Sequence, residues 1–158
     1  MLKRKLTIAV ATMHAKGLVP RFCKHPYLIV DQGDSPYLDG DPSFEYHFSF
    51  ERGISNSRNA AIRLCKTEYL LFADDDVFHI DKGVERIEDY FEKTSADILT
   101  FVTMTPEGGF FKKYKSVSFL HTRLSLFRVN SVEIAVRVNS VRRAGLQFDS
   151  AFGLGSTY

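Results

Sequence analysis

The sequence predicts one α/β domain in which helices pack against a β-sheet. Short apolar runs alternate along the chain with segments whose apolar residues recur every three or four positions, and this alternation is typical of α/β folds. The length of 158 residues suits a single domain. The 44% of apolar and 25% of charged residues exclude a disordered or fibrous chain. No apolar run approaches the roughly 20 residues of a membrane span.

The predicted strands are short apolar runs that end at polar turns. Phe110–Tyr114 is expected to return as a hairpin partner after the turn at Pro106–Gly109. The strands themselves are expected at Leu6–Ala11, Tyr27–Val30, Tyr46–Phe50, Tyr69–Ala73, Ile98–Met104 and Glu133–Val138.

The predicted helices open at residues whose side chains can accept a hydrogen bond from a first-turn amide. The first is expected to end near Cys65, and the last to stop at Gly145. Val84, Ile87 and Phe91 give the middle helix an apolar face. The expected caps are Ser55 or Ser57, then Asp81, then Asn139.

Charge is uneven along the chain. Residues 1–100 hold 13 Lys and Arg against 16 Asp and Glu, a net charge of −3, whereas residues 101–158 hold 8 against 3, a net charge of +5. The overall charge of +2 is too mild to predict a nucleic-acid partner. The basic part is either a solvated surface, a surface completed by another element, or a face for an acidic substrate or an anionic membrane.

Three consecutive carboxylates, Asp74, Asp75 and Asp76, directly follow the strand at Tyr69–Ala73. Open α/β sheets bind ligands at the carboxyl ends of their strands. Three adjacent like charges repel, and a divalent cation would neutralise them. Oxygen ligands suit Mg²⁺ or Mn²⁺. The alternative is that an aspartate here only caps the next helix.

A second candidate segment is Gly53–Asn59, which opens a helix. Helix N-termini attract anions through free amides and the helix dipole. Arg58 would add a bidentate donor for phosphate or carboxylate. The alternative is a surface arginine paired with Glu51 or Glu68.

Taken together, Gly53–Ile62 (GISNSRNAAI) and Thr67–Asp76 (TEYLLFADDD) resemble family 2 glycosyltransferases. In that family a glycine turn and an Arg-Asn pair precede a strand that leads to a D-x-D metal motif. Later segments, Glu133–Arg137, Ala144–Asp149 and Phe152–Gly155, are also similar. The resemblance covers most of the chain. It implies a GT-A-like, Rossmann-like open mixed sheet with helices on both faces.

The resemblance also implies the metal site. Asp76 would be the main ligand of Mn²⁺ or Mg²⁺, together with Asp74. Asp74 would also face the ribose or the sugar of a nucleotide-diphospho-sugar, and Asp75 would support it.

The nucleotide pocket follows from the same resemblance. Arg58 would face the nucleotide. Thr12 and Asp31, which follow the first two strands, stand where the family holds base and ribose. The turn after the second strand is a variant of the family pattern, so Asp34 could replace Asp31.

The expected activity is metal-dependent, inverting transfer of a sugar to a saccharide or lipid-linked acceptor, as in surface polysaccharide assembly. Residues 1–110 would bind donor and metal, and residues 111–158 would begin the acceptor side of the same domain. The family's general base belongs to an acidic motif expected beyond Tyr158, so the domain is expected to be incomplete at its C-terminus. Asp149 is the nearest, weak candidate within the chain.

Two other functions stay open. The chain could be a non-catalytic module that binds a nucleotide-sugar or a metal, or a metal-dependent phosphohydrolase that uses the aspartates. The presence of only 2 cysteines favours a reducing compartment. The expected location is the cytoplasm, with peripheral association at the inner face of the membrane.

Overall fold

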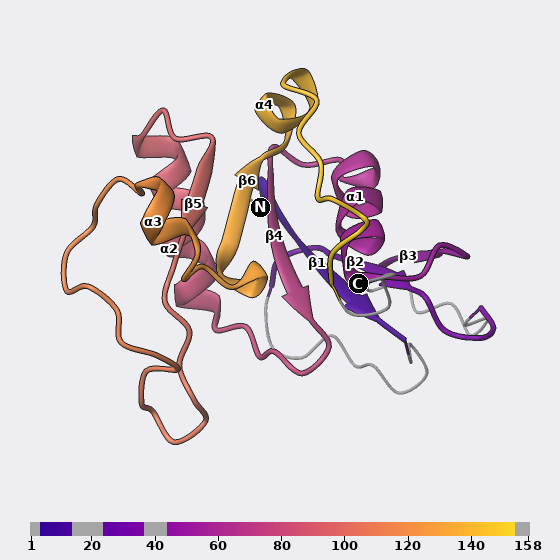
Figure 1. The fold of residues 1–158 in the computed structure, drawn as a ribbon, viewed down its shortest axis with the longest axis horizontal. Helices are drawn as coiled ribbons and strands as arrows, with labels where there is room; N and C mark the ends of the chain where they lie inside the picture. Colours follow the sequence, from indigo (N-terminus) through magenta and orange to yellow (C-terminus); the bar gives the residue numbers. More distant parts are fainter. Residues whose placement is uncertain (1–3, 14–23, 37–43, 154–158) are drawn as a thin grey trace.

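The computed structural model describes residues 4–13, 24–36 and 44–153, and within them the strands form a six-stranded mixed sheet (Figure 1). The strand order is β3-β2-β1-β4-β6-β5. The strands β1 to β4 run parallel to one another, while β6 lies antiparallel between β4 and β5. Their bounds are β1 Leu6–Thr12, β2 Tyr27–Asp31, β3 Glu45–Phe48, β4 Tyr69–Asp74, β5 Ile98–Thr100 and β6 Ile134–Arg137.

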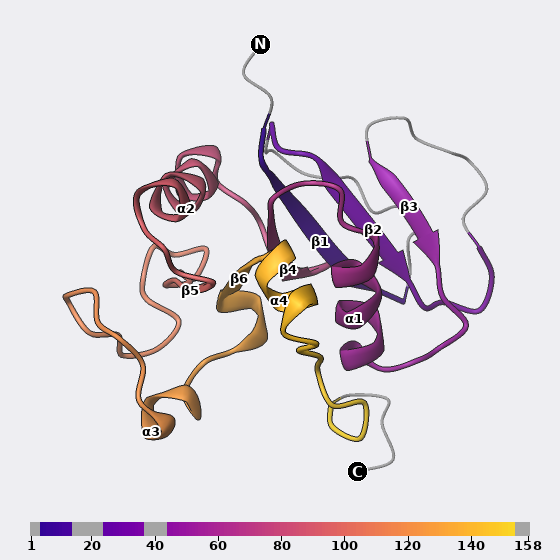
Figure 2. The ribbon, with the colours of Figure 1, turned by 90° about the horizontal axis from the view of Figure 1, so that it is seen from above.

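Two apolar layers hold the helices to the sheet. The helix α2 (Asp81–Lys93) packs on one face through Val84 and Phe91. The helices α1 (Ile54–Leu64) and α4 (Val138–Arg143) pack on the other (Figure 2). The central strands β1, β2 and β4 are apolar almost throughout because both of their faces are buried. The predicted open mixed sheet with helices on both faces is therefore confirmed.

The predicted caps of the three main helices are wrong by one to four residues. Gly53 is the N-cap of α1, with a φ of 109° that favours glycine, so Ser55 and Ser57 lie inside the helix and are buried. Ile80 is the N-cap of α2, and the Asp81 carboxylate instead accepts a hydrogen bond from the backbone N–H of Lys24, 2.7 Å away. In α4 the cap is Arg137, and Asn139 lies within the helix. Tertiary packing, rather than side-chain capping, fixes these starts.

The end of α4 agrees with the sequence. Gly145 has a φ of 64°, its N–H donates to the carbonyl of Arg142, and the N–H of Leu146 donates to that of Val141. This is the Schellman arrangement, which needs a left-handed residue after the helix.

The chain leaves the sheet earlier than predicted. The expected strand at Ile98–Met104 pairs only over β5, and the rest begins a long excursion at one side of the molecule (Figure 1). We call residues 101–130 the 101–130 extension. It includes a turn closed by an isolated Met104–Phe110 bridge and the short helix α3 (Arg123–Leu126). The predicted hairpin is therefore reduced to that bridge.

The chain returns through the 3₁₀ helix η1 (Ser131–Glu133), so Glu133 precedes β6 rather than starting it. The strand β6 then pairs with both β4 and β5. Among the described residues, no helix has the length and apolar character needed to cross a bilayer.

Candidate functional site

The predicted site residues gather at the carboxyl edge of the parallel strands. Thr12 ends β1 and is the register partner of Asp31, which ends β2. On the other side of β1, Ala11 pairs with Asp74, the last residue of β4. Because parallel strands end at the same edge, residues far apart in the sequence meet there.

Arg58 reaches this edge from α1. Its Nη2 donates to Oδ1 of Asp74 at 3.1 Å, and its side chain is almost fully buried. Neither surface partner considered from the sequence, Glu51 or Glu68, pairs with it in this arrangement. The buried guanidinium and the strand-end carboxylate compensate each other, because burying either charge without the other would cost free energy.

Burial is the main cause that raises the pKa of Asp74. The Arg58 charge and hydrogen bond act in the opposite direction, while the neighbouring Asp76 and Asp75 charges raise the pKa further. The site is thus a cluster of mutually repelling carboxylates that one guanidinium compensates only in part.

The other two aspartates face solvent. Asp75 Oδ2 accepts a hydrogen bond from the Thr12 hydroxyl at 2.7 Å, which joins the ends of β1 and β4. Asp76 is exposed and makes no hydrogen bond or ion pair with the described residues. The carbonyl of Asp74 accepts from the N–H of Val77, so the chain turns at this triplet and none of the three caps α2.

The donor set suits a hard divalent cation. Its oxygens belong to three carboxylates, of which Asp74 and Asp75 are partly engaged with Arg58 and Thr12, whereas Asp76 has no partner among the described residues. In the described part of the chain, no three His, Cys, Asp or Glu side chains already converge as a metal cage. A cation would therefore be held by a few carboxylates and complete its shell with water and donor oxygens, as Mg²⁺ commonly does.

The two candidate residues after β2 differ in environment. Asp31 is buried, and its oxygens accept from the N–H of Gly33 at 2.9 Å and the hydroxyl of Tyr46 at 2.9 Å. Asp34 lies at the surface and pairs with Arg52. Asp31 therefore shapes the turn and the end of β3, while Asp34 faces solvent.

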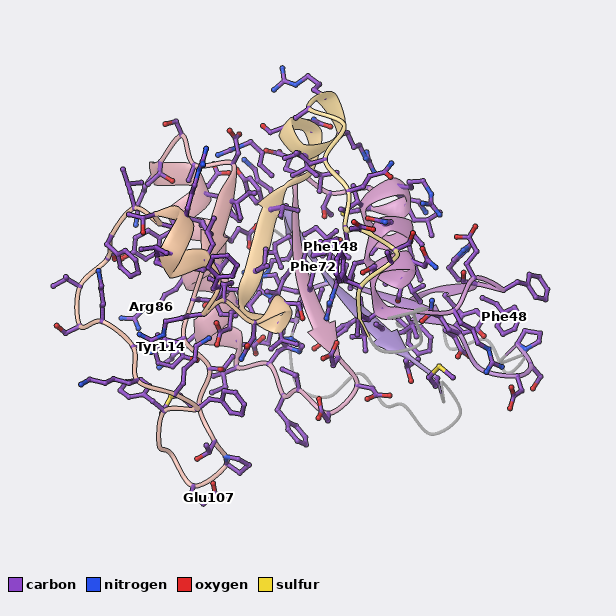
Figure 3. The ribbon with its side chains drawn as sticks, in the orientation of Figure 1. Phe48, Phe72, Arg86, Glu107, Tyr114 and Phe148 are labelled. Atoms are coloured by element: carbon purple, nitrogen blue, oxygen red, sulfur yellow. The ribbon has the colours of Figure 1, made fainter. Side chains whose placement is uncertain are left out.

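Sequence reasoning missed a contact between α1 and the segment after α4. The Asn59 side chain bonds both backbone groups of Phe148, at 2.9 Å and 2.8 Å. The Phe148 ring lies beside Phe72 of β4 (Figure 3), in an edge-on contact with ring centroids 5.2 Å apart. Asn59 belongs to the Arg-Asn pair noted in the sequence, but its partner lies 89 residues away and gave no local signal.

A second missed feature is the buried carboxylate of Glu133. It accepts hydrogen bonds from Lys112 Nζ and the Tyr114 hydroxyl, both at 2.6 Å, and from the N–H of Asn130 at 3.1 Å. Burial by itself would raise the pKa of Glu133, but these hydrogen bonds together outweigh it and lower the pKa. Glu133, next to β6, thus ties the middle of the 101–130 extension and its C-terminal end to the sheet.

Asp149 forms a turn of its own. Its Oδ1 accepts from the N–H of Ala151 at 2.9 Å, and its carbonyl accepts from the N–H of Phe152. This is the geometry of an Asx turn.

The fold is that of the GT-A-like glycosyltransferases. The chain superimposes on S. aureus TarS 1–349 in complex with UDP with a TM-score of 0.68 at 14% identity, over 96% of this chain and 52% of that one. For the same protein in complex with UDP-GlcNAc the TM-score is 0.66 at 14% identity, over 92% and 49% of the two chains.

The chain belongs to glycosyl transferase family 2, as the motifs predicted, because the family model matches residues 35–149. Mouse beta-1,4 N-acetylgalactosaminyltransferase 1 is 36% identical over 46% of this chain. Mouse beta-1,4 N-acetylgalactosaminyltransferase 2 is 30% identical over 64% of this chain. The chain spans only 14% and 21% of the lengths of these two relatives.

Proposed function

We propose that the carboxyl edge of β1, β2 and β4 binds a nucleotide-diphospho-sugar with Mn²⁺ or Mg²⁺, and serves transfer of the sugar to a saccharide or lipid-linked acceptor. The observation that carries the proposal is the meeting of Thr12, Arg58 and Asp74–Asp76 at this edge. Family membership and the likeness to TarS structures with UDP and UDP-GlcNAc support a nucleotide-sugar donor.

Each residue has a task in this proposal. Asp76, exposed at the end of the triplet, and Asp74 hold the cation. The bound cation supplies positive charge opposite the negative charge that develops on the departing diphosphate. Arg58 holds Asp74 in place and keeps one side of the cluster compensated. Thr12 fixes Asp75 beside the first strand.

The direct test is calorimetric titration of UDP and other nucleoside diphosphates with and without Mn²⁺. Asp76→Asn should remove most of the metal-dependent affinity. Asp97→Asn is the matched control, because Asp97 is exposed and precedes β5 at the opposite edge of the sheet. Absence of metal-dependent binding to any nucleoside diphosphate would refute the proposal, as would full affinity in Asp76→Asn.

Transfer needs its own assay. Release of nucleoside diphosphate that requires an acceptor supports a transferase, whereas binding without release supports the non-catalytic module. Release of phosphate without an acceptor supports the phosphohydrolase. We propose inversion at the anomeric carbon and a role in surface polysaccharide assembly. NMR of the product measures the anomeric configuration and so tests the inversion.

We propose further that the 101–130 extension mediates peripheral association with an anionic membrane. Its exposed apolar side chains include Leu120, Leu124 and Phe127, which are 94%, 80% and 88% exposed. Lys115 precedes these residues in the sequence, and Arg123 lies between Leu120 and Leu124. Apolar and basic groups on one segment match the interface of an anionic bilayer.

Sedimentation with phosphatidylcholine vesicles, with and without phosphatidylglycerol, tests this association. Binding should need phosphatidylglycerol and fall in Leu120→Ser and Phe127→Ser. Phe50→Ser is the control, because Phe50 is 91% exposed just after β3, outside the extension. Binding that is independent of phosphatidylglycerol or of these side chains would contradict the proposal. The cytoplasmic location stays a prediction, which cell fractionation can check.

A further inference from the structure

The segment after α4 is seated along α1 beside the Arg58–Asp74 pair. Ser55 Oγ donates to the carbonyl of Phe152 at 2.8 Å, and Asn59 bonds the backbone of Phe148 on both sides. Ser55 and Asn59 are four residues apart, so they lie on one face of the helix. Figure 1 shows this segment passing between α1 and β4.

The Phe148 ring also contacts the guanidinium. Arg58 Cζ lies 5.7 Å from the ring centroid, and the ring also makes an edge-on contact with Phe72 in the core of β4. A cation near an aromatic ring is attracted by the ring quadrupole, and more strongly where water is excluded.

The hydrogen bonds of Arg58 do not by themselves fix the plane of its guanidinium. Only Nη2 bonds Asp74, and the buried Nε makes no hydrogen bond. A guanidinium is a rigid fork of five N–H donors, and one hydrogen bond fixes its plane less firmly than a bidentate pair does. A second contact of the guanidinium is the Phe148 ring.

We propose that Asn59 and Phe148 are positioning residues that set the orientation of Arg58 and, through it, of Asp74. Asn59 fixes the Phe148 backbone, Phe72 fixes the ring, and the ring fixes the guanidinium. The segment after α4 thereby completes the strand-edge site from a distance of more than 80 residues in sequence. The inference about orientation stands on these contacts alone, and its effect on ligand binding rests on the proposed function.

The first test reads the orientation of Arg58 without any ligand. In ¹⁵N–¹H spectra the Arg58 Nε–H should be shifted by the aromatic ring and protected from exchange with water. Phe148→Leu should move this resonance and accelerate its exchange at least tenfold, while Phe148→Tyr, which keeps the ring, should restore both. Phe152→Leu is the matched control, because the Phe152 side chain is 65% exposed.

Asn59→Ala should shift the same resonance in the same direction, because it releases the backbone of Phe148 and leaves the ring intact. It also decides the question if Phe148→Leu does not fold. An Arg58 Nε–H that is unchanged in the folded variants would overturn the proposal.

The second test uses UDP affinity in the presence of Mn²⁺. Phe148→Leu should weaken binding about five- to tenfold, between the effects of an exposed and of a fully desolvated cation–π contact. If Phe148 acts through Arg58, then Phe148→Leu should add nothing further in an Arg58→Gln background, which removes the cation. Additive losses would overturn the proposal. A wild-type chain that binds no nucleotide would refute the proposed function instead, and the NMR test would still decide the orientation.

Discussion

The substitution Glu133→Gln probes the contact that ties the 101–130 extension to the sheet. The carboxylate accepts from Lys112 and Asn130 on Oε2, and from Tyr114 on Oε1. A glutamine can keep an oxygen toward Tyr114, but its amide nitrogen then faces two donors. The variant therefore loses two acceptor contacts and a charge in one step.

The expected cost follows from these contacts. A hydrogen bond to a charged group contributes about 1.5–3 kcal/mol, and a buried unsatisfied donor costs about 1–3 kcal/mol. Lys112 is 22% exposed and can turn partly to water, which favours the lower end of both ranges. We expect Glu133→Gln to lower the free energy of unfolding by about 3 kcal/mol.

The pH dependence of the free energy of unfolding gives a second, independent test of the Glu133 contact. The pKa of Glu133 in the folded state lies below its ordinary value of 4.5. The stabilisation by its charged form is therefore complete above pH 4.5 and is lost as the pH falls through the folded-state pKa. The free energies of unfolding of wild type and Glu133→Gln should converge in that acidic range.

Urea unfolding followed by far-UV circular dichroism measures the free energy at several pH values. Hydrogen exchange of residues 101–130 reports whether the extension loosens before the sheet. Glu107→Gln is the control for the free energy of unfolding at neutral pH, because Glu107 is exposed on the turn of the same extension. A difference below about 0.5 kcal/mol, with unchanged pH dependence, would refute the reasoning.

Three further substitutions test other contacts. Phe91→Ala should lower the free energy of unfolding by about 3–5 kcal/mol, measured by urea titration, because Phe91 is fully buried under the sheet. Tyr46→Phe removes the hydroxyl that donates to buried Asp31, and calorimetry should show a loss of about 1.5–3 kcal/mol without a change of fold. Gly153→Ala should release the segment after α4, seen as faster amide exchange of that segment, because a Cβ there would lie 2.5 Å from Cγ2 of Ile54 at a φ of 109°. Equal stability or exchange in any variant would contradict the corresponding contact.

The central part of the fold could be predicted because its signals are local. The run Tyr69–Ala73 is apolar because both faces of β4 are buried, and it leads directly into the aspartates. The helix with Val84, Ile87 and Phe91 shows its buried face in its spacing. The end of α4 could be predicted because the residue that follows it, Gly145, takes a positive φ that favours glycine.

The helix starts and the extension could not be predicted in the same way. Gly53 precedes serines that are good caps, and only the buried packing of α1 shows that the glycine takes the cap position. The strand after Ile98 reads as apolar to Met104, but Phe101 donates its N–H to the carbonyl of Glu133 and the chain then leaves the sheet. Tertiary contacts override local propensity at such places.

The sequence by itself determined the order of strands and helices, the family and the triplet Asp74–Asp76, because each depends on neighbours in the chain. Only the tertiary structure decided which partners these groups meet. It put Arg58 on Asp74, Phe148 over Arg58 and Lys112 on Glu133. The physical reason is that burial and charge compensation act between residues that are close in space. The distance between two such residues in space cannot be predicted from their separation in the sequence.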